Sequence, residues 1–380
     1  MTESFNNLIQ IIHAAFDIGL PSLTLTDEEC DDVVALAARQ SILPILDAGM
    51  KKARITGVSK EKLSEIDKAR LKDMRRYILY YDALEKISNA LDETEIDYIP
   101  LKGSVLRNLY PAPYMRTSSD IDVLVKEEAV DRAVEVIETQ TDFKTDHRAY
   151  HDISMLNPSV HLELHFSLKE NAENIDKLLS RAWDYAEATR EGSRYIFTPE
   201  YQIFYVVAHM SHHFLHGGLG IRPFLDLWML RSKTRYDEDE VRSMCSECGI
   251  LTFYEECCKL CSVWLEGAPP TETTELLEQF CLSGGVFGNH EFKTAARQRE
   301  KRGARYILSR IFPPANQVRE YYSNTYDEKH SMGYYYLKRL WRWAGRRSEL
   351  KHQMKDIMST DAAFLDASDR LLKLMGLFET

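Results

Sequence analysis

The sequence predicts an α+β protein in which a small mixed sheet is flanked by helical regions on both sides. Three observations support this. Apolar residues recur at helical spacing through residues 1–92, short β-type runs alternate with helical runs through residues 93–190, and helical patterns return through residues 191–380. We therefore expect three regions: an N-terminal helical region (1–92), an α/β core (93–190) and a C-terminal helical region (191–380).

The N-terminal region shows three helical signals. Apolar residues between Leu8 and Ala15 lie on one helix face. Thr26 and Glu29 have the spacing of a capping box, which predicts a helix that begins after Thr26. A third helix is expected from about Lys60 to Leu91.

The core is expected to alternate between strands and helices. Its last two strands face each other across a turn at Asn157-Pro158-Ser159. The expected elements are a strand over 97–102, a short helix from Gly103, a strand over 120–125, a helix over 127–140, and two strands within 147–168.

The C-terminal region begins with a short β-like run over 194–198. Thr198 and Pro199 then predict a capped helix start, because proline suits the first helical turn. Glycine-rich segments at 217–220 and 283–288 are expected to separate helices.

The main chemical signal is the pair Asp120 and Asp122. Alternate residues of a strand share a face, so both carboxylates point one way while Ile121 and Val123 point into a core. Two anions held this close repel each other unless a cation lies between them. Magnesium binds to one or two carboxylates together with substrate phosphates, which makes a metal site the expected purpose of the pair.

Two further patterns complete the constellation. In the run His161–His165, Glu163 lies on the polar face of a second strand and can supply a third carboxylate. Gly103 and Ser104 stand at a strand exit where a helix begins, a place where backbone N–H groups bind phosphate. Each pattern alone also fits a solvated surface, but the three in order within one α/β unit favour a catalytic site.

At these residues the chain resembles the polymerase-β-like nucleotidyltransferase superfamily, and more closely a bacterial family of uncharacterised nucleotidyltransferases with helical flanks. The resemblance implies a small mixed-sheet nucleotidyltransferase core. It also implies that a nucleoside monophosphate passes from an NTP, with ATP the expected donor, to an acceptor by a two-metal mechanism that uses Mg²⁺ or Mn²⁺. The acceptor is left open: a small molecule, a protein or a tRNA.

The resemblance also implies roles for individual residues. Asp120 and Asp122 would hold the metals, and Glu163 would join them and orient or deprotonate the acceptor hydroxyl. The nucleotide would be bound by Lys102, Gly103, Ser104 and Arg116. Glu163 departs from the aspartate that many members of the superfamily carry at this position, so its metal geometry is less defined.

Four histidines, His209, His212, His213 and His216, fall on one stripe of an expected helix. A single stripe cannot wrap one zinc ion. A polar helix face is one interpretation. We favour the other, in which His213, with Arg222 and Asp226, lines the nucleotide or acceptor cleft.

Charge and cysteine content narrow the remaining possibilities. The net charge of −11 argues against a dedicated DNA-binding protein. The basic and aromatic residues within 338–347 fit an ordinary amphipathic surface better than an RNA site. The seven cysteines are expected to be buried free thiols.

No run of apolar residues is long enough for a membrane span, and the N-terminus lacks a signal-peptide pattern. We therefore expect a cytoplasmic protein, and its oligomeric state is left open.

The alternative to an enzyme is a non-catalytic nucleotide-binding or scaffold protein that retains the fold. A metal-dependent phosphohydrolase is disfavoured because the sequence lacks the additional His and Asp ligands expected for one.

Overall fold

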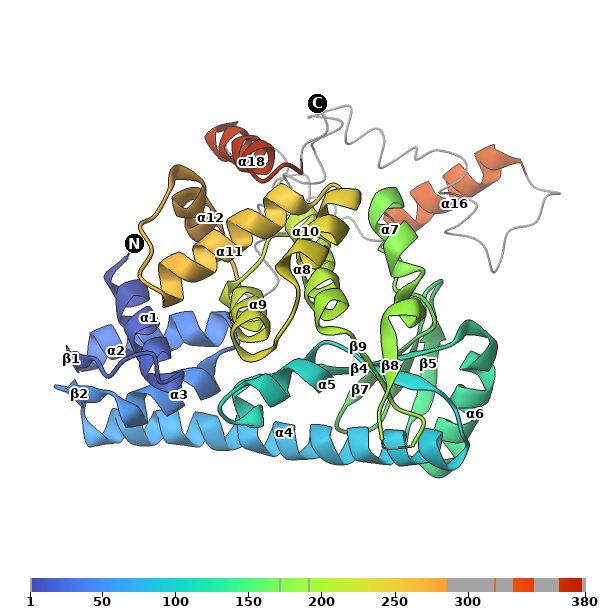
Figure 1. Ribbon diagram of the computed structural model, residues 1–380, viewed down its shortest axis with the longest axis horizontal. Coiled ribbons are helices and arrows are strands. Elements are labelled where there is room, and N and C mark those ends of the chain that lie inside the picture. Colours follow the sequence, from blue (N-terminus) through green and yellow to red (C-terminus); the bar gives the residue numbers. More distant parts are fainter. Residues whose placement is uncertain are drawn as a thin grey trace.

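The computed structural model describes residues 2–170, 172–190, 192–285, 318, 331–344 and 362–377. The N-terminal region is built from four helices, and the longest, α4, runs along one edge of the molecule beneath the others (Figure 1). The Thr26–Glu29 capping box is present as predicted. The helices are α1 (Glu3–Ala15), α2 (Asp27–Arg39), α3 (Leu43–Lys52) and α4 (Lys60–Glu93).

The expectation of a purely helical N-terminal region is wrong in one detail. Strands β1 (Ser22–Thr24) and β2 (Arg54–Thr56) form a small parallel ribbon beside the helices. Each strand has only three residues, so neither is long enough to show the two-residue alternation by which a strand is recognised in sequence.

The core is a five-stranded mixed sheet with strand order β3-β4-β7-β6-β5. The central pair, β4 and β7, is parallel, whereas the other pairs are antiparallel. The turn predicted between the last two strands is confirmed, since the Asn157 side chain accepts hydrogen bonds from the backbone of Ser159 and Val160. The strands are β3 (Tyr98–Pro100), β4 (Asp120–Val125), β5 (Lys144–Arg148), β6 (Asp152–Leu156) and β7 (His161–His165).

One face of this sheet is covered by α4 and by α6 (Val130–Gln140) (Figure 1). Ile121, Val123 and Val125 of β4 are buried in this layer, as the alternation in the sequence predicts. The neighbouring side chains of β4 therefore emerge on the opposite face. Short helices connect β3 to β4 and β4 to α6: α5 (Gly103–Leu106) and the 3₁₀ turns Arg107–Leu109, Pro113–Met115 and Glu127–Ala129.

A small antiparallel ribbon joins the core to the C-terminal helices, and its second strand contacts β3. Thr198 caps α8 and Pro199 is its first residue, as predicted. The described elements are α7 (Glu173–Leu179), the 3₁₀ turn Ala182–Tyr185, β8 (Ala186–Ala188), β9 (Tyr195–Phe197), α8 (Pro199–His216), α9 (Ile221–Lys233), α10 (Glu238–Glu247), α11 (Leu251–Leu265), α12 (Glu272–Ser283), α16 (Met332–Ala344) and α18 (Ala362–Leu374).

The two helical regions share one hydrophobic core. Phe5 of α1 packs edge-on against Trp264 of α11, with ring centroids 5.5 Å apart, and the His13 ring is hydrogen-bonded to the Trp264 carbonyl. The N-terminal helices are therefore packed directly on the C-terminal ones, although the α/β core separates them in sequence. The division of the chain into three regions, with boundaries at residues 92 and 190, stays a prediction.

Three further expectations concern the rest of the chain. All seven cysteines are free thiols, and all but Cys258 are buried, as predicted. None of the described helices, including the long but highly charged α4, combines the length and apolarity needed to cross a bilayer. Of the basic segment 338–347, residues up to 344 lie in α16 and the last three lie outside the described residues.

Candidate active site

The carboxylates of the predicted constellation come from two adjacent parallel strands. Asp122 of β4 stands directly opposite Glu163 of β7, and Asp120 stands opposite His161. Both strands bury their apolar residues under α4 and α6, so the acidic side chains face away from that layer. Asp122 is buried, whereas Asp120 and Glu163 are partly exposed.

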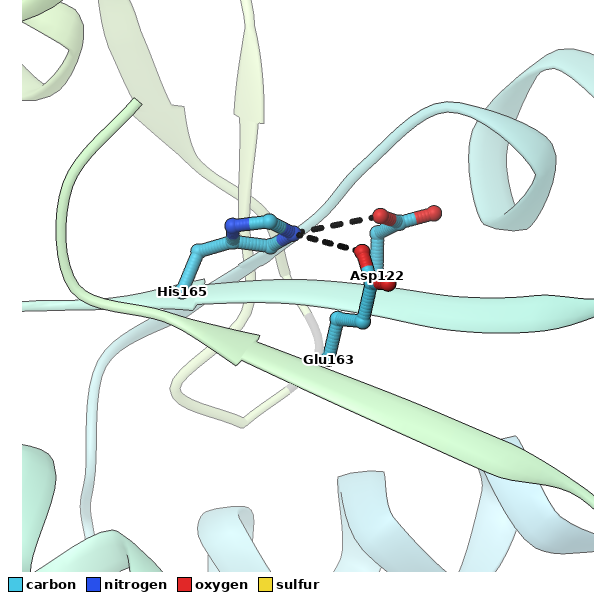
Figure 2. A group of neighbouring side chains, drawn as sticks. All are labelled: Asp122, Glu163 and His165. Carbon is cyan, nitrogen blue, oxygen red and sulfur yellow. Dashed lines mark hydrogen bonds and ion pairs between the residues drawn. The ribbon is translucent and has the colours of Figure 1, made fainter. Parts of the chain in front are cut away.

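Asp122 is held between a lysine ammonium and a histidine ring. The Nζ atom of Lys102 lies 2.9 Å from Asp122 Oδ1, and the Nε2 atom of His165 lies 3.1 Å from the same oxygen. The same His165 nitrogen lies 3.6 Å from Glu163 Oε2, so the imidazole bridges the two carboxylates (Figure 2).

These contacts set the charges of the group. Burial alone would raise the pKa of Asp122, but the Lys102 ammonium and the His165 imidazole together hold it well below its usual range. Burial would lower the pKa of His165, but its hydrogen bonds to Asp122 and Glu163 raise it. Burial and the two neighbouring carboxylates raise the pKa of Asp120. A carboxyl in that state gains from a nearby cation.

The ligand atoms of Asp122, Glu163 and His165 all lie within 4.8 Å of one another. Within the described residues this is the one group of three or more such side chains that is close enough to hold a metal ion. Asp120 lies outside this group in the structure but lines the same cavity. The position of His165 was visible in the alternation of His161, Glu163 and His165, yet it was not among the predicted site residues.

Lys102 reaches Asp122 from an unusual backbone conformation. Its φ of 44° is positive, which is uncommon for a residue other than glycine. The backbone N–H of Ser104 donates a hydrogen bond to the Leu101 carbonyl, which closes a turn around Lys102. The backbone N–H of Leu101 donates to the Asp122 carbonyl. The turn is thus attached directly to β4, and it carries the ammonium to the carboxylate. Backbone strain of this kind concentrates at functional sites.

Gly103 and Ser104 take different positions. Gly103 lines the cavity, and a Cβ atom there would lie 2.0 Å from Ser118 Oγ, so only glycine lets α5 pack against the segment before β4. The Ser104 hydroxyl is buried and lies 2.6 Å from the Tyr80 hydroxyl of α4. It does not line the cavity, and its role in phosphate binding stays a prediction.

A cavity of about 320 Å³ lies between the carboxylates and helices α8 and α9. Of the ten predicted site residues, all except Ser104 line it: Lys102, Gly103, Arg116, Asp120, Asp122, Glu163, His213, Arg222 and Asp226. Residues separated by more than a hundred positions in sequence therefore meet in one space.

Arg116 is bound to α9 within this wall. Its Nε and Nη2 atoms donate to the carboxylate of Asp226 at 3.0 and 2.9 Å, and the Tyr110 hydroxyl donates to the same carboxylate at 2.8 Å. Its Nη1 atom donates to Ser118 Oγ at 2.9 Å. Breaking a buried pair of this kind by removing one partner is strongly destabilising. Arg116 therefore fixes the segment before β4 against α9.

Two residues of the histidine stripe, His209 and His213, line the cavity together with Glu170. The Nδ1 atom of His209 lies 2.9 Å from Glu170 Oε1, and its Nε2 atom lies 2.9 Å from His213 Nε2. Burial would raise the pKa of Glu170, but the bond to His209 lowers it to about 2. Burial and the neighbouring His209 lower the pKa of His213 to about 3. Glu170 and His209 were not among the predicted site residues, although the stripe pointed to this helix face.

Three comparisons with known proteins bear on the family of this chain. A model of the uncharacterised nucleotidyltransferase family matches residues 26–266, more than half of the chain. A comparison with curated proteins found no match. One solved structure that was found, of the antibiotic-resistance factor ANT(2'')-Ia, is 12% identical in sequence and has a TM-score of 0.35, with 44% of this chain and 90% of that chain covered. The family match extends from the cap of α2 to the end of α11 and includes every residue of the cavity, so this chain belongs to the uncharacterised nucleotidyltransferases.

Proposed function

We propose that this protein transfers a nucleoside monophosphate from an NTP, with ATP the preferred donor, to a hydroxyl group of an acceptor. The observation that carries the proposal is the register of β4 and β7, which puts Asp122 beside Glu163 on the wall of a cavity that also holds Asp120 and Lys102. Membership of the nucleotidyltransferase family supports the same reaction class.

The carboxylates fit divalent metal ions. Three side chains that offer oxygen ligands line one cavity, and oxygen ligands suit Mg²⁺ and Mn²⁺. We assign Asp120, Asp122 and Glu163 as the metal ligands, with His165 orienting the last two through its hydrogen bonds. Two such ions, when bound, would neutralise the triphosphate and hold the attacking and leaving oxygens in line.

The transfer is a substitution at the α-phosphorus. The acceptor oxygen forms a bond to the α-phosphorus while the bond from that phosphorus to the oxygen bridging the α- and β-phosphates breaks. Pyrophosphate leaves with the electron pair of that bond, and the hydroxyl proton passes to Glu163. Lys102, Gly103 and Arg222 line the same cavity and are assigned to the triphosphate. Arg116 positions this wall through Asp226. His213 is assigned to the side of the nucleotide facing α8.

The test is release of pyrophosphate from ATP and the other NTPs with Mg²⁺ and a panel of hydroxyl-bearing acceptors. We expect the wild type to release pyrophosphate, and Asp122→Asn to lose at least 100-fold of that activity, since electrostatic groups of an active site contribute about that much. Asp97→Asn is the matched control, because Asp97 pairs with Lys126 outside the cavity. Tight binding of NTP with no turnover across the panel would overturn the proposal in favour of a non-catalytic binding protein.

A further inference from the structure

A second cavity adjoins the candidate active site. It measures about 430 Å³ and lies between α4, the 3₁₀ turn that begins at Arg107, and the turn at Ser159. Arg116, Ser118, Ser119 and Arg222 line both cavities, so the segment that leads into Asp120 forms a shared wall. A molecule in the second cavity would therefore lie directly beside the carboxylates.

The second cavity carries more positive charge than its own acids neutralise. Four arginines line it, at positions 76, 107, 116 and 222. The one carboxylate that lines it, Asp73, lies 3.5 Å from Arg76, and Arg116 is already paired with Asp226. In the described part of the chain, no carboxylate lies within ion-pair distance of Arg107 or Arg222. Burying a cation without a counterion is costly, so the cavity favours an anion.

Both unpaired arginines also have hydrogen-bonding atoms to spare. Arg107 is only 3% exposed, yet its buried Nη2 atom has no hydrogen-bond partner among the described residues. The same is true of the buried Nε atom of Arg222. Burial and the nearby Arg116 lower the pKa of Arg222 to about 10.

Arg107 is nevertheless firmly placed. Its guanidinium lies over the Tyr80 ring, 3.7 Å from the centroid, and its Nε atom donates to the Gly103 carbonyl at 2.6 Å. A guanidinium fixed in this way loses little conformational freedom when it binds a ligand. Planar guanidinium groups with free N–H donors match the arrangement of the oxygens of a phosphate group. The hydroxyls of Ser118 and Ser119 on the shared wall add further possible donors.

We propose that the second cavity binds a phosphate group of the acceptor, so that the acceptor is a phosphorylated small molecule. This inference rests on the proposed function, since it names the acceptor of that reaction. The cavity has the volume of a small-molecule site. Tyr77 and Tyr114 also line it and offer ring faces for the rest of the acceptor. With its phosphate held by Arg107, the acceptor points a hydroxyl past Ser119 toward Asp120 and the α-phosphate of the NTP, which Arg222 contacts from the shared wall.

The experiment measures binding by isothermal titration calorimetry, with inorganic phosphate, ribose 5-phosphate and ribose as probes. The full-length protein is used with and without a saturating non-hydrolysable ATP analogue and Mg²⁺. We expect phosphate and ribose 5-phosphate to bind in the presence of the analogue, and ribose to bind at least about tenfold more weakly than ribose 5-phosphate, because a charge-assisted hydrogen bond contributes about that factor.

Variants locate the binding site. Arg107→Gln should weaken ribose 5-phosphate binding at least about tenfold. Arg76→Gln should weaken it several-fold, whereas Arg75→Gln, on the exposed neighbour that does not line the cavity, should not change it. Ser159 lies on an exposed turn, so Ser159→Asp and the uncharged Ser159→Asn test the charge of the cavity without touching a buried group. We expect only the aspartate variant to weaken binding.

The outcomes separate this inference from the proposed function. Equal binding by the wild type, Arg107→Gln and Ser159→Asp would overturn the inference, as would a folded wild type that binds neither phosphate nor ribose 5-phosphate. Loss of phosphate binding when the ATP analogue is added would assign the phosphate to the nucleotide itself and would also overturn it. If phosphate binding depends on Arg107 but the ATP analogue does not bind, the anion cavity stands and the proposed function fails.

Discussion

At the scale of single residues, Asp122 is the centre of the site because a lysine and a histidine already contact it. Lys102 and His165 approach the same carboxylate oxygen, at 2.9 and 3.1 Å. A metal ion that binds Asp122 shares the negative charge of this carboxylate with both groups, or displaces one of them. The Lys102 ammonium, on a flexible stem, is the group that can move, and triphosphate oxygens would be a second partner for it.

Replacing Lys102 should therefore separate metal binding from nucleotide binding. Lys102→Met removes the competitor for Asp122, so Mn²⁺ alone should bind more tightly, by a few-fold. The ATP analogue should bind more weakly, because a cation facing the phosphates is lost. Both constants can be measured by electron paramagnetic resonance and calorimetry. Lys126→Met, which removes a lysine paired with Asp97 outside the cavity, is the control. Weaker Mn²⁺ binding by Lys102→Met would show that the lysine does not compete with the metal.

His213 makes a prediction about acid stability. Its pKa falls to about 3 in the folded protein, mainly because it is buried, whereas an unfolded histidine titrates near 6.5. Between these values the unfolded chain binds more protons, so stability must decrease as the pH falls from about 6.5 to 3. His213→Gln should lose part of this dependence.

Urea unfolding of the wild type and His213→Gln at several pH values from 7 to 4 measures this slope directly. Glu170 and His209 contact the same cluster and contribute slopes of the same sign, since the pKa of each is lowered. The comparison between variants isolates the share of His213. His147→Gln, at an exposed histidine outside the cavity, is the matched control. Identical slopes for the wild type and His213→Gln would contradict the prediction.

At the scale of elements, strands with a buried face could be predicted well and isolated short strands could not. The alternation of Asp120 to Val125 and of His161 to His165 revealed both strands and the face that carries the acids, because one side of each is pressed against a core. The β1–β2 ribbon left no such pattern. The bridging position of His165 depends on the register between β4 and β7, which a single sequence does not define.

Side-chain contacts between elements that are distant in sequence could not be predicted either. Ser104 is predicted to bind phosphate because it begins a helix, and that role stays a prediction. Its contact with the Tyr80 hydroxyl of α4 could not be predicted from spacing. The anion-binding role proposed for Arg107 could not be predicted from the sequence. It is inferred from the Tyr80 ring beneath the guanidinium and from a buried Nη2 atom that has no hydrogen-bond partner among the described residues. Such contacts join elements that sequence spacing does not relate.

The close approach of α5 to the segment before β4 should be sensitive to a single methyl group. Gly103→Ala places a Cβ atom 2.0 Å from Ser118 Oγ and 3.1 Å from Ser118 Cβ, so one segment must shift. We expect a loss of about 1–3 kcal/mol in the free energy of unfolding, as for other overpacked sites. Pyrophosphate release should also fall, because a shift of α5 or of the segment before β4 would move Lys102 or Asp120, which adjoin them.

Two variants check that the clash causes these effects. Gly103→Ala combined with Ser118→Ala removes the nearest atom and should recover part of the stability. Gly19→Ala adds a methyl group where nothing lies within 4 Å and should have little effect. Equal stability of Gly103→Ala and the wild type in chemical denaturation would show that the segment adjusts freely.

At the scale of the whole molecule, the site depends on helices that come both before and after the α/β core in the sequence. The carboxylates lie on the sheet, whereas His213 and Arg222 lie on α8 and α9, which share their core with α1–α3. The N-terminal helices thus support one wall of the cavity, although none of the residues that line the cavity belongs to them. Their packing should affect stability strongly and chemistry weakly.

Phe5 allows these two effects to be measured separately. It is fully buried and packs against Trp264, so Phe5→Ala should lower the free energy of unfolding by about 3–5 kcal/mol. The cavity lies on other elements, so kcat per folded molecule should stay close to that of the wild type at a temperature where the variant remains folded. Unfolding of the variant should still occur in one transition followed by both Trp fluorescence and circular dichroism, because α1 and α11 belong to one core. A separate early transition confined to the N-terminal helices would instead show that they fold as an independent unit, and that the wall formed by α8 and α9 stands without them.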